Sequence, residues 1–562
     1  MAISIWVLLS ILPIAVAFTF LVVLRKKAII SMGFGWIVAS LLGLFVWRMD
    51  FAWWGTTVVY GGLQASEIII TIFGAILLMG YLERSGALGT IRWHFTTIHR
   101  DRRVQLLLLG YGVITIIEGV AGFGTPAALV APLMIGLGFP PLAAAVFSLW
   151  FNAPNPPFGV AGIPTLHGVG SVIVDVLPGG MEQEFMDGVV RWVGVFTGSA
   201  YVLWGSLAVF FMLYWFGKAG QGRGRQALRG TVEILPFALV LGLAAGGTTM
   251  VMARFFGGEL PAITTGLVCL GLGLFMAQRG ILMPRNVWEF PDVALWDDVW
   301  RGGLSQERLV RTEPQKNMPV WMGWLPYLAV ASFLFVTRLP ALGIVDWLQQ
   351  FTVGMTNLFG SELSFRVRPL YVPGFLPFLP VAIMTGWLHR VPLDGVVQVW
   401  KKTGRQVLPA AMTLIVAVSM AQIMIQSGTN FSGQSSMIHT LSTVVASAAG
   451  NALPMVTPWI GVLGAFMTGS NTSSNILFST LQYQAAEELG LSRTIIVALQ
   501  STSGGIGNLI SVLNVAAIAG VTGISGREGD VIRKTVVPLL IYGLGAGLLG
   551  LLLVHVLVPS LF

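Results

Sequence analysis

Long apolar runs, separated by short polar stretches, recur along the whole chain. The clearest of them cover residues 4–24, 28–48, 57–82, 192–216, 230–250, 259–278, 319–337, 406–426 and 535–559. A helix needs about 20 such residues to cross the hydrocarbon core of a membrane. Once helices interrupted within the membrane are included, the pattern predicts an all-α polytopic membrane protein with about 12–14 transmembrane helices.

One region, residues 116–165, interrupts the apolar pattern with glycine, proline and small polar residues. An apolar segment meets a glycine-rich break at Gly122–Thr125, and a helical stretch, a turn around Gly138 and a second apolar stretch follow. The region ends in a second break, NAPNPP, at residues 152–157. This order predicts broken helices instead of continuous spans.

A second region, residues 464–520, has the same order of features. Its breaks fall at Gly469–Asn475 and at residues 501–505, with a turn around Gly490 between them. Irregular backbone survives at membrane depth only where it is buried in protein or lines a wet cavity. Two such interrupted regions in corresponding halves therefore indicate the binding site of a secondary transporter. The alternative is that they are surface loops between ordinary helices.

The residues at the first breaks favour helix starts that point into the protein. Thr125 suits an N-cap and Pro126 suits the first helical position. At the other break the candidate caps are Ser470, Asn471, Thr472 and Ser473. An open helix start carries about half a positive charge and attracts an anion by ~0.3–2 kcal/mol. Two starts facing one cavity would hold a small carboxylate without a fixed cation, which costs ~3 kcal/mol or more near the bilayer centre.

Charge and cysteine content narrow the class of protein. Only 10% of residues are charged, against about one quarter in a soluble protein. The net charge of +8 does not indicate a nucleic-acid partner, because the basic residues gather in short stretches at 25–27, 84–103, 218–229 and 401–405. There they act as topology signals that place the N-terminus outside. The single cysteine excludes a disulfide within the chain.

Motifs of other functional classes are missing from the sequence. It contains no HExxH, no GxSxG, no Cys/His cluster with metal spacing and no GxxxxGK[ST]. We therefore expect neither an enzyme nor a primary pump, and no metal or cofactor. A channel is the remaining alternative, and two broken repeats in one chain suit alternating access better than a symmetric pore.

Several blocks of sequence carry a resemblance to a known family. They are EGVAGFGTPAALVAPLMIGLGFPPLAAA (118–145), FNAPNPPFGVAGIP (151–164), GVLGAFMTGSNTSSNILFSTLQYQAA (461–486) and GREGDVIRKT (526–535). These blocks resemble the lactate permease family of bacteria. The resemblance implies a multi-pass protein of the bacterial inner membrane that moves a 2-hydroxy monocarboxylate (lactate or glycolate) with a proton.

The resemblance also implies two inverted repeats with re-entrant hairpins, as in a wider ion-transporter superfamily. Some dicarboxylate transporters there hold substrate and sodium with Ser-Asn-Thr at hairpin tips, which here is Ser470-Asn471-Thr472. The chain departs from the usual family pattern at GSNTSSN (469–475), where members carry GSDTSSN, so that Asn471 replaces a carboxylate. It reads GNLISVLN where members carry GKMISPQS, so that Asn508 replaces a lysine. An acidic and a basic residue are thus lost together, as the two partners of a pair would be.

Glu118 lies where an apolar helix meets the first break, and it matches the family. An acid near membrane depth indicates a functional role, and we predict that it binds and releases the coupled proton; capping of backbone N–H groups is the alternative. Neutral hydroxyls, amides and backbone N–H groups can bond the carboxylate and hydroxyl oxygens of a substrate. The predicted substrate-binding residues are Gly122, Gly124, Thr125, Asn152, Asn155, Gly469, Ser470, Asn471, Thr472, Ser473, Ser501, Ser503, Asn508 and Asn514.

These observations divide the chain into helices that hold the site and helices that surround it. The predicted parts are 1–103 (N-terminal helices), 104–217 (first repeat), 218–405 (further helices, with a cytoplasmic amphipathic segment at 279–318), 406–534 (second repeat) and 535–562 (C-terminal helix). We expect a proton-coupled symporter of small 2-hydroxy monocarboxylates embedded in the lipid bilayer. A sodium-coupled transporter, or one for another organic anion, is the alternative. Self-association stays open.

Overall fold

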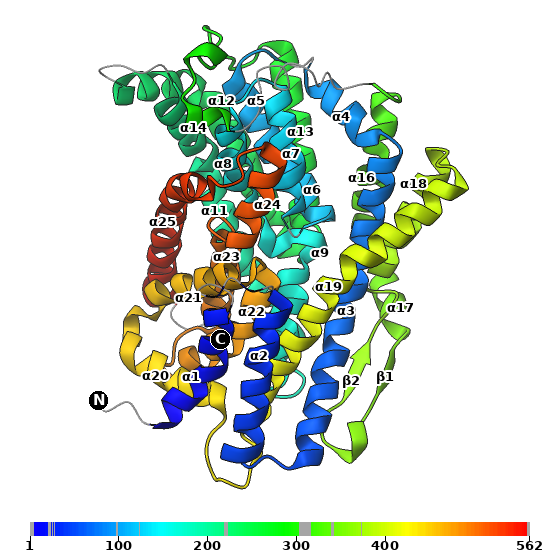
Figure 1. The fold of residues 1–562 in the computed structure, drawn as a ribbon, viewed down its shortest axis with the longest axis vertical. Coiled ribbons are helices and arrows are strands. Elements are labelled where there is room, and N and C mark those ends of the chain that lie inside the picture. Colours follow the sequence, from blue (N-terminus) through cyan, green and yellow to red (C-terminus); the bar gives the residue numbers. More distant parts are fainter. Residues whose placement is uncertain are drawn as a thin grey trace.

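The computed structural model describes residues 5–20, 24, 26, 28–96, 99–122, 124–217, 223–302, 316–338, 342–372 and 374–558. Within them the chain is almost entirely helical (Figure 1). The α-helices are α1 (Ile5–Phe18), α2 (Ala28–Leu41), α3 (Phe51–Arg84), α4 (Ala87–Thr96), α5 (Arg102–Leu107), α6 (Thr115–Val120), α7 (Thr125–Gly136), α8 (Pro141–Asn152), α9 (Gly159–Ile163), α10 (Gly170–Ile173), α11 (Glu182–Phe216), α12 (Arg223–Phe255), α13 (Pro261–Arg279), α14 (Asp298–Arg301), α16 (Val320–Arg338), α17 (Ile344–Gln350), α18 (Leu379–Leu388), α19 (Leu393–Gln426), α20 (Met437–Ala449), α21 (Leu453–Thr468), α22 (Asn471–Glu488), α23 (Arg493–Gly507), α24 (Val512–Thr522) and α25 (Glu528–Leu552).

Shorter elements join or extend these helices. They are the π-helical pieces η2 (Leu42–Val46), η3 (Leu108–Ile114), η5 (Pro164–Val169), η9 (Gly374–Phe378) and η11 (Leu553–Leu557), and the 3₁₀ turns η4 (Pro156–Phe158), η6 (Val293–Leu295), η8 (Leu358–Gly360) and η10 (Gly450–Ala452). Strands β1 (Val353–Met355) and β2 (Phe365–Val367) form an antiparallel hairpin in which Gly354 pairs with Arg366.

Nine helical segments of the described chain are long and apolar enough to cross a membrane. They are Ile29–Val46, Phe51–Arg84, Arg102–Val120, Glu182–Phe216, Arg223–Phe255, Pro261–Arg279, Val320–Thr337, Leu393–Gln426 and Glu528–Leu557. Each predicted run except the first coincides with one of them; the first yields only the shorter α1 within the described residues. With the additional short apolar helices, the prediction of an all-α multi-pass membrane protein is confirmed.

The first break of each region begins where the sequence predicts it, but that of the second region is shorter than the predicted Gly469–Asn475, because α22 starts at Asn471. Helix α6 ends at Val120 before α7, and α21 ends at Thr468 before α22. Gly124 and Gly469 have φ angles of 75° and 71°, a left-handed conformation that glycine adopts without strain. The predicted cap of α7 needs correction, however, because Gly124 occupies the N-cap and Thr125 is already helical. The side chain of Thr125 lies outside the described residues.

The second break of the second region was predicted at residues 501–505, and this prediction is wrong. Helix α23 continues to Gly507, and the chain breaks only between α23 and α24. Thr502 and Ser503 return their hydroxyl hydrogens to the carbonyls of Ala498 and Leu499, one turn earlier, so they leave the helix intact. In the first region the predicted break is confirmed, since α8 ends at Asn152.

The two hairpins that follow the breaks lie at different levels. In Figure 1, α7 and α8 lie above α22 and α23, and α24, which packs beside α7, returns to the upper level. The inverted orientation of the two repeats stays a prediction.

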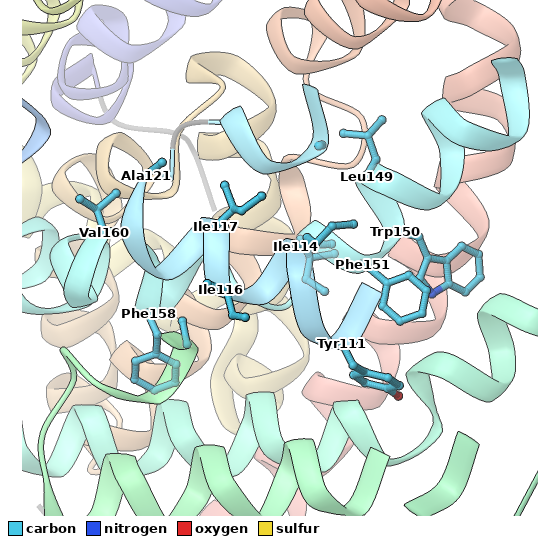
Figure 2. Packing of buried hydrophobic residues seen from close by; sticks show 14 of the residues in the cluster. Tyr111, Ile114, Ile116, Ile117, Ala121, Leu149, Trp150, Phe151, Phe158 and Val160 are labelled. Atoms are coloured by element: carbon cyan, nitrogen blue, oxygen red, sulfur yellow. The ribbon is translucent and has the colours of Figure 1, made fainter. Parts of the chain in front are cut away.

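Apolar packing fixes the helix that leads into the first break. Figure 2 shows side chains of this part of the core from η3, α6, α8 and the segment after it. Tyr111 packs edge-on against Phe151 with ring centroids 5.3 Å apart, and Phe158 and Val160 are buried on the other side of the cluster. The end of α6 is therefore held within the protein and cannot act as a surface loop.

The predicted amphipathic segment 279–318 is described only to residue 302 and again from 316. Its described part contains only η6 and α14, so it forms no long surface helix there. It packs on the start of α5 instead: the Trp288 N–H donates to the Asp101 carboxylate at 3.0 Å, and Asp101 also forms a buried ion pair with Arg103 at 2.7 Å.

Candidate functional site

The two first breaks meet at one small internal cavity. The Asn514 side chain, on α24, connects them: its Nδ2 donates to the Gly469 carbonyl at 3.3 Å, and a Cβ added to Gly124 would lie 3.0 Å from its Oδ1. The cavity measures about 20 Å³ and is lined by Glu118, Gly122, Pro156, Gly159, Val160, Pro164, Gly469, Ser470, Asn471, Thr472 and Asn508. Segments about 350 residues apart in the sequence thus line one small polar site.

Two helix starts lie at or beside this cavity: Ser470, Asn471 and Thr472 at the start of α22 line it, and α7 begins shortly after the lining residue Gly122. The first N–H groups of any helix lack partners within that helix. At α22 the Ser470 hydroxyl accepts a hydrogen bond from the Ser473 N–H at 3.3 Å, which satisfies one of them. At α7 the N-cap Gly124 offers no such side chain. Both starts carry partial positive charge, so their surroundings favour an anion.

Glu118 is the ionisable side chain among the described residues that line the cavity. It is 3% exposed, its carboxyl group lies against the Asn152 amide, and its Oε2 has no hydrogen-bond partner among the described atoms. On its other side it touches the backbone, because a Cβ added to Gly159 would lie 2.5 Å from its Oε1. A carboxyl group in this position is enclosed by the two broken regions and has one oxygen free to bind a proton or a ligand.

Neutral amides complete the lining. Both polar atoms of the Asn471 side chain and Oδ1 of Asn508 are buried without a hydrogen-bond partner among the described residues. A buried polar group without a partner costs about 1–3 kcal/mol, so such atoms call for a ligand or ordered water. The two asparagines offer amide groups that bond carboxylate or hydroxyl oxygens.

Not every predicted site residue reaches the cavity. Glu118, Gly122, Gly469, Ser470, Asn471, Thr472 and Asn508 line it, and Gly124, Asn152 and Asn514 lie directly behind. Ser503 bonds within α23, and Asn155 donates to the Phe151 carbonyl at 2.6 Å while accepting from the Tyr201 hydroxyl. Ser473 donates its N–H to the Ser470 cap. Ser503, Asn155 and Ser473 therefore bond to the helices around the cavity and do not line it.

Ser501 belongs to a buried network behind the cavity. Its Oγ lies 2.9 Å from Thr165 Oγ and accepts from Asn475 Nδ2 at 3.0 Å. Asn475 Nδ2 also donates to the carbonyl of Pro164, at 2.7 Å. Sequence reasoning missed Asn475 and Thr165, although Asn475 ends the polar stretch GSNTSSN at the first break of the second region.

The segment after α8 supplies lining residues that sequence reasoning also missed. Pro156, Gly159, Val160 and Pro164 line the cavity. Val160 and Ala161 have φ angles of 45° and 51°, a left-handed conformation that is uncommon for residues other than glycine. The proline-rich sequence NAPNPP signals a break but not this tight turn.

Comparisons with known proteins identify the family. The L-lactate permease family model matches residues 6–557. The glycolate permease GlcA of Escherichia coli (strain K12) is 27% identical, covering 98% of this chain and 96% of that protein. The L-lactate permease of the same strain is 27% identical over 99% and 97%, and that of Bacillus subtilis (strain 168) is 26% identical over 89% and 87%.

Among solved structures, the YdaH transporter of Alcanivorax borkumensis covers 90% of this chain and 87% of its own, with a TM-score of 0.43 and 12% identity. That likeness is too slight to inform the site, whereas the family match spans nearly the whole chain. With its membrane-spanning helices, the chain is a multi-pass membrane protein and belongs to the L-lactate permease family.

Proposed function

We propose that this protein is a symporter that carries small 2-hydroxy monocarboxylates, such as lactate and glycolate, together with a proton. The observation that carries the proposal is the shared cavity, where two helix starts, two unpartnered asparagines and one buried acid converge. The names of the relatives, L-lactate permease and glycolate permease, support the substrate class.

The carboxylate of the substrate would lie at the start of α22, near the N–H groups of Asn471 and Thr472. A helix start stabilises an anion by ~0.3–2 kcal/mol, more when it is buried. The Asn471 and Asn508 amides would bond the 2-hydroxyl group and the remaining carboxylate oxygen. The lining contains no Lys or Arg among its described residues, so backbone and amide dipoles supply the attraction.

Glu118 would couple the substrate to the proton. Two negative charges in one enclosed cavity repel each other strongly, because little water is present to screen them. A proton on Glu118 removes this repulsion, so protonation and binding of the anion favour each other. Linkage of this kind makes the carrier move both ligands together.

Sodium coupling of the same site is the rival reading. Asn471 Oδ1 and the Ser470 and Thr472 hydroxyls provide neutral oxygen atoms at the start of α22, and a hard cation prefers oxygen ligands. An imposed gradient separates the two: a proton-coupled carrier concentrates lactate when only a pH gradient is present, and a sodium-coupled one when only a Na⁺ gradient is present.

The test measures uptake of labelled L-lactate into proteoliposomes. Wild-type protein should accumulate it under a pH gradient, and Glu118→Gln should reduce that accumulation by more than about tenfold while it retains exchange of internal for external lactate. Glu83→Gln is the matched control, because Glu83 is exposed and pairs with Lys402 at 2.8 Å. Full pH-driven accumulation by Glu118→Gln would overturn the coupling role.

A further inference from the structure

A second polar cluster lies outside the cavity, around Asp175 in the turn after α10. One carboxylate oxygen accepts from the Tyr60 hydroxyl of α3 at 2.9 Å, and the other accepts from Gln422 Nε2 of α19 at 2.8 Å. Gln422 Nε2 also lies 2.8 Å from Gln64 Oε1 and 3.0 Å from the Ser171 carbonyl. Three parts of the chain, distant in sequence, therefore meet at one carboxyl group.

The hydrogen bonds of this cluster are unbalanced. The Gln422 amide has two N–H hydrogens but three acceptors in reach, while its own Oε1 is buried without a hydrogen-bond partner among the described residues. Gln422 is fully buried, so water from the surface does not reach it. An ionised Asp175 has no hydrogen to give to that oxygen, and a protonated Asp175 has one.

The cluster also lies at a mechanical junction. Helices α3 and α19 pack tightly, since a Cβ added to Gly61 would lie 2.6 Å from the Ser419 Cα and the Ser419 hydroxyl donates to the Val58 carbonyl at 3.0 Å. Asp175 ends a short segment that begins at the cavity-lining Pro164. That segment is tied to the second region by the Thr480 hydroxyl, which donates to the Val172 carbonyl at 2.9 Å.

We propose that Asp175 is a second proton-binding site, whose protonation exchanges its hydrogen bonds with Gln422 and so changes the link between the cavity wall and the α3–α19 pair. In the ionised state Asp175 accepts from Tyr60 and Gln422. After it takes one proton from water, it donates to Gln422 Oε1 once the amide has rotated. This inference rests on the proposed proton-coupled transport and adds a proton site to it.

Water can reach the neighbourhood of this site. A cavity of about 490 Å³ is lined by Tyr60, Gln64 and Ser171, which belong to or adjoin the cluster. Besides Tyr60, the charged or titratable residues that line it are His167 from η5, Glu182 from α11, Arg366 from β2 and Arg368 just after β2. The neutral Gln422 of α19 bonds Asp175 without lining this cavity. Asp175 lies outside the membrane-spanning helices, and burial raises the pKa of its carboxyl group to about 6, against the opposing effect of the hydrogen bonds from Gln422 and Tyr60.

The test has two readouts, the pH profile of lactate exchange without a gradient and the infrared band of a protonated carboxyl group. Wild-type exchange should change with an inflection near pH 6, and Asp175→Asn should remove both this inflection and the carboxyl band that appears at lower pH. Glu182→Gln, which lines the same cavity without bonding Asp175, should keep both. Tyr60→Phe removes a hydrogen bond that favours the ionised form, so it should move the inflection to higher pH.

The outcomes separate this inference from the proposed function. If wild-type uptake ignores a pH gradient, proton coupling fails, while the infrared band still reports whether Asp175 binds a proton. If wild-type uptake follows the gradient and Asp175→Asn keeps the wild-type profile and band, the Asp175 site is wrong. Should Asp175→Asn not fold, an unshifted inflection in Tyr60→Phe gives the same negative answer.

Discussion

The two helix breaks meet at one cavity, but they differ in chemistry. The first region contributes the acid Glu118 and a helix start without a side-chain cap. The second contributes the capped start at Ser470 and the amides of Asn471 and Asn508, with no ionisable side chain among the described lining residues. Two regions that share one order of features therefore divide the work: we expect the first to bind the proton and the second to bind the oxygens of the substrate.

The difference extends to the backbone. After its hairpin, the second region has a short break and then the regular helix α24. The first has a long irregular path through η4, α9 and η5, with a left-handed turn at Val160 and Ala161. This path wraps around Glu118 and forms much of the cavity lining. An enclosed acid needs such a wall, because exposure to water would weaken its interaction with the substrate.

Gly159→Ala should have the largest effect, because it disturbs the acid. The new Cβ would lie 2.5 Å from Glu118 Oε1, so the carboxyl group must move. Overpacking of this kind costs about 1–3 kcal/mol, and we expect pH-driven lactate accumulation to fall by about tenfold or more. Gly136→Ala on α7 is the control, since its Cβ meets open space. Unchanged accumulation would show that the position of Glu118 does not matter for coupling.

Gly504→Ala is the matching change in the second region and should have a smaller effect. Its Cβ would overlap Asn471 Oδ1, so the amide must leave its present position. We expect KM for lactate to rise by about five- to tenfold, the worth of one hydrogen bond, with the wild-type dependence on pH retained. Gly520→Ala on α24, whose Cβ meets open space, is the control. A changed pH profile with an unchanged KM would reverse the proposed division of roles.

These glycines also explain what the sequence could and could not predict. Gly122, Gly124 and Gly469 act through local backbone geometry, so the first breaks were predictable from a few adjacent residues. In the sequence, Gly504 and Gly505 resemble the glycines of the first breaks. In the structure, however, they lie within α23 and allow close packing against Asn471 and Pro157. Only tertiary contact distinguishes a glycine that breaks a helix from one that lets another segment approach.

The candidate site follows the same rule. Glu118 and the stretch around Asn471 stood out because a polar residue at membrane depth is costly in any arrangement. The Asp175 cluster did not, because its partners Tyr60 and Gln422 are 115 and 247 residues away in the sequence. The pairing of such residues depends on the fold, and a single sequence contains no signal for it.

Ser470→Ala should lower stability more modestly, by ~1 kcal/mol, because it removes the hydroxyl that caps α22. Ser470→Gly should cost only a few tenths of a kcal/mol, since glycine is tolerated at an N-cap. Thermal unfolding of the purified protein in detergent measures both variants. At the start of α7, the corresponding N-cap position is already glycine, Gly124. Equal losses of stability for alanine and glycine would mean that the Ser470 hydroxyl, and not the backbone conformation, stabilises the start of α22.

Ser501→Ala should have the smallest effect on transport. Its hydroxyl bonds Thr165 and Asn475 behind the cavity, and Asn475 keeps its bond to the Pro164 carbonyl when Ser501 is lost. We expect stability to fall by ~1 kcal/mol while KM and the pH profile stay close to wild type. Asn471→Ala is the comparison, because it removes an amide that lines the cavity. If Ser501→Ala raised KM as much as Asn471→Ala, α23 would share in substrate binding, and the second region's site would be wider than the start of α22.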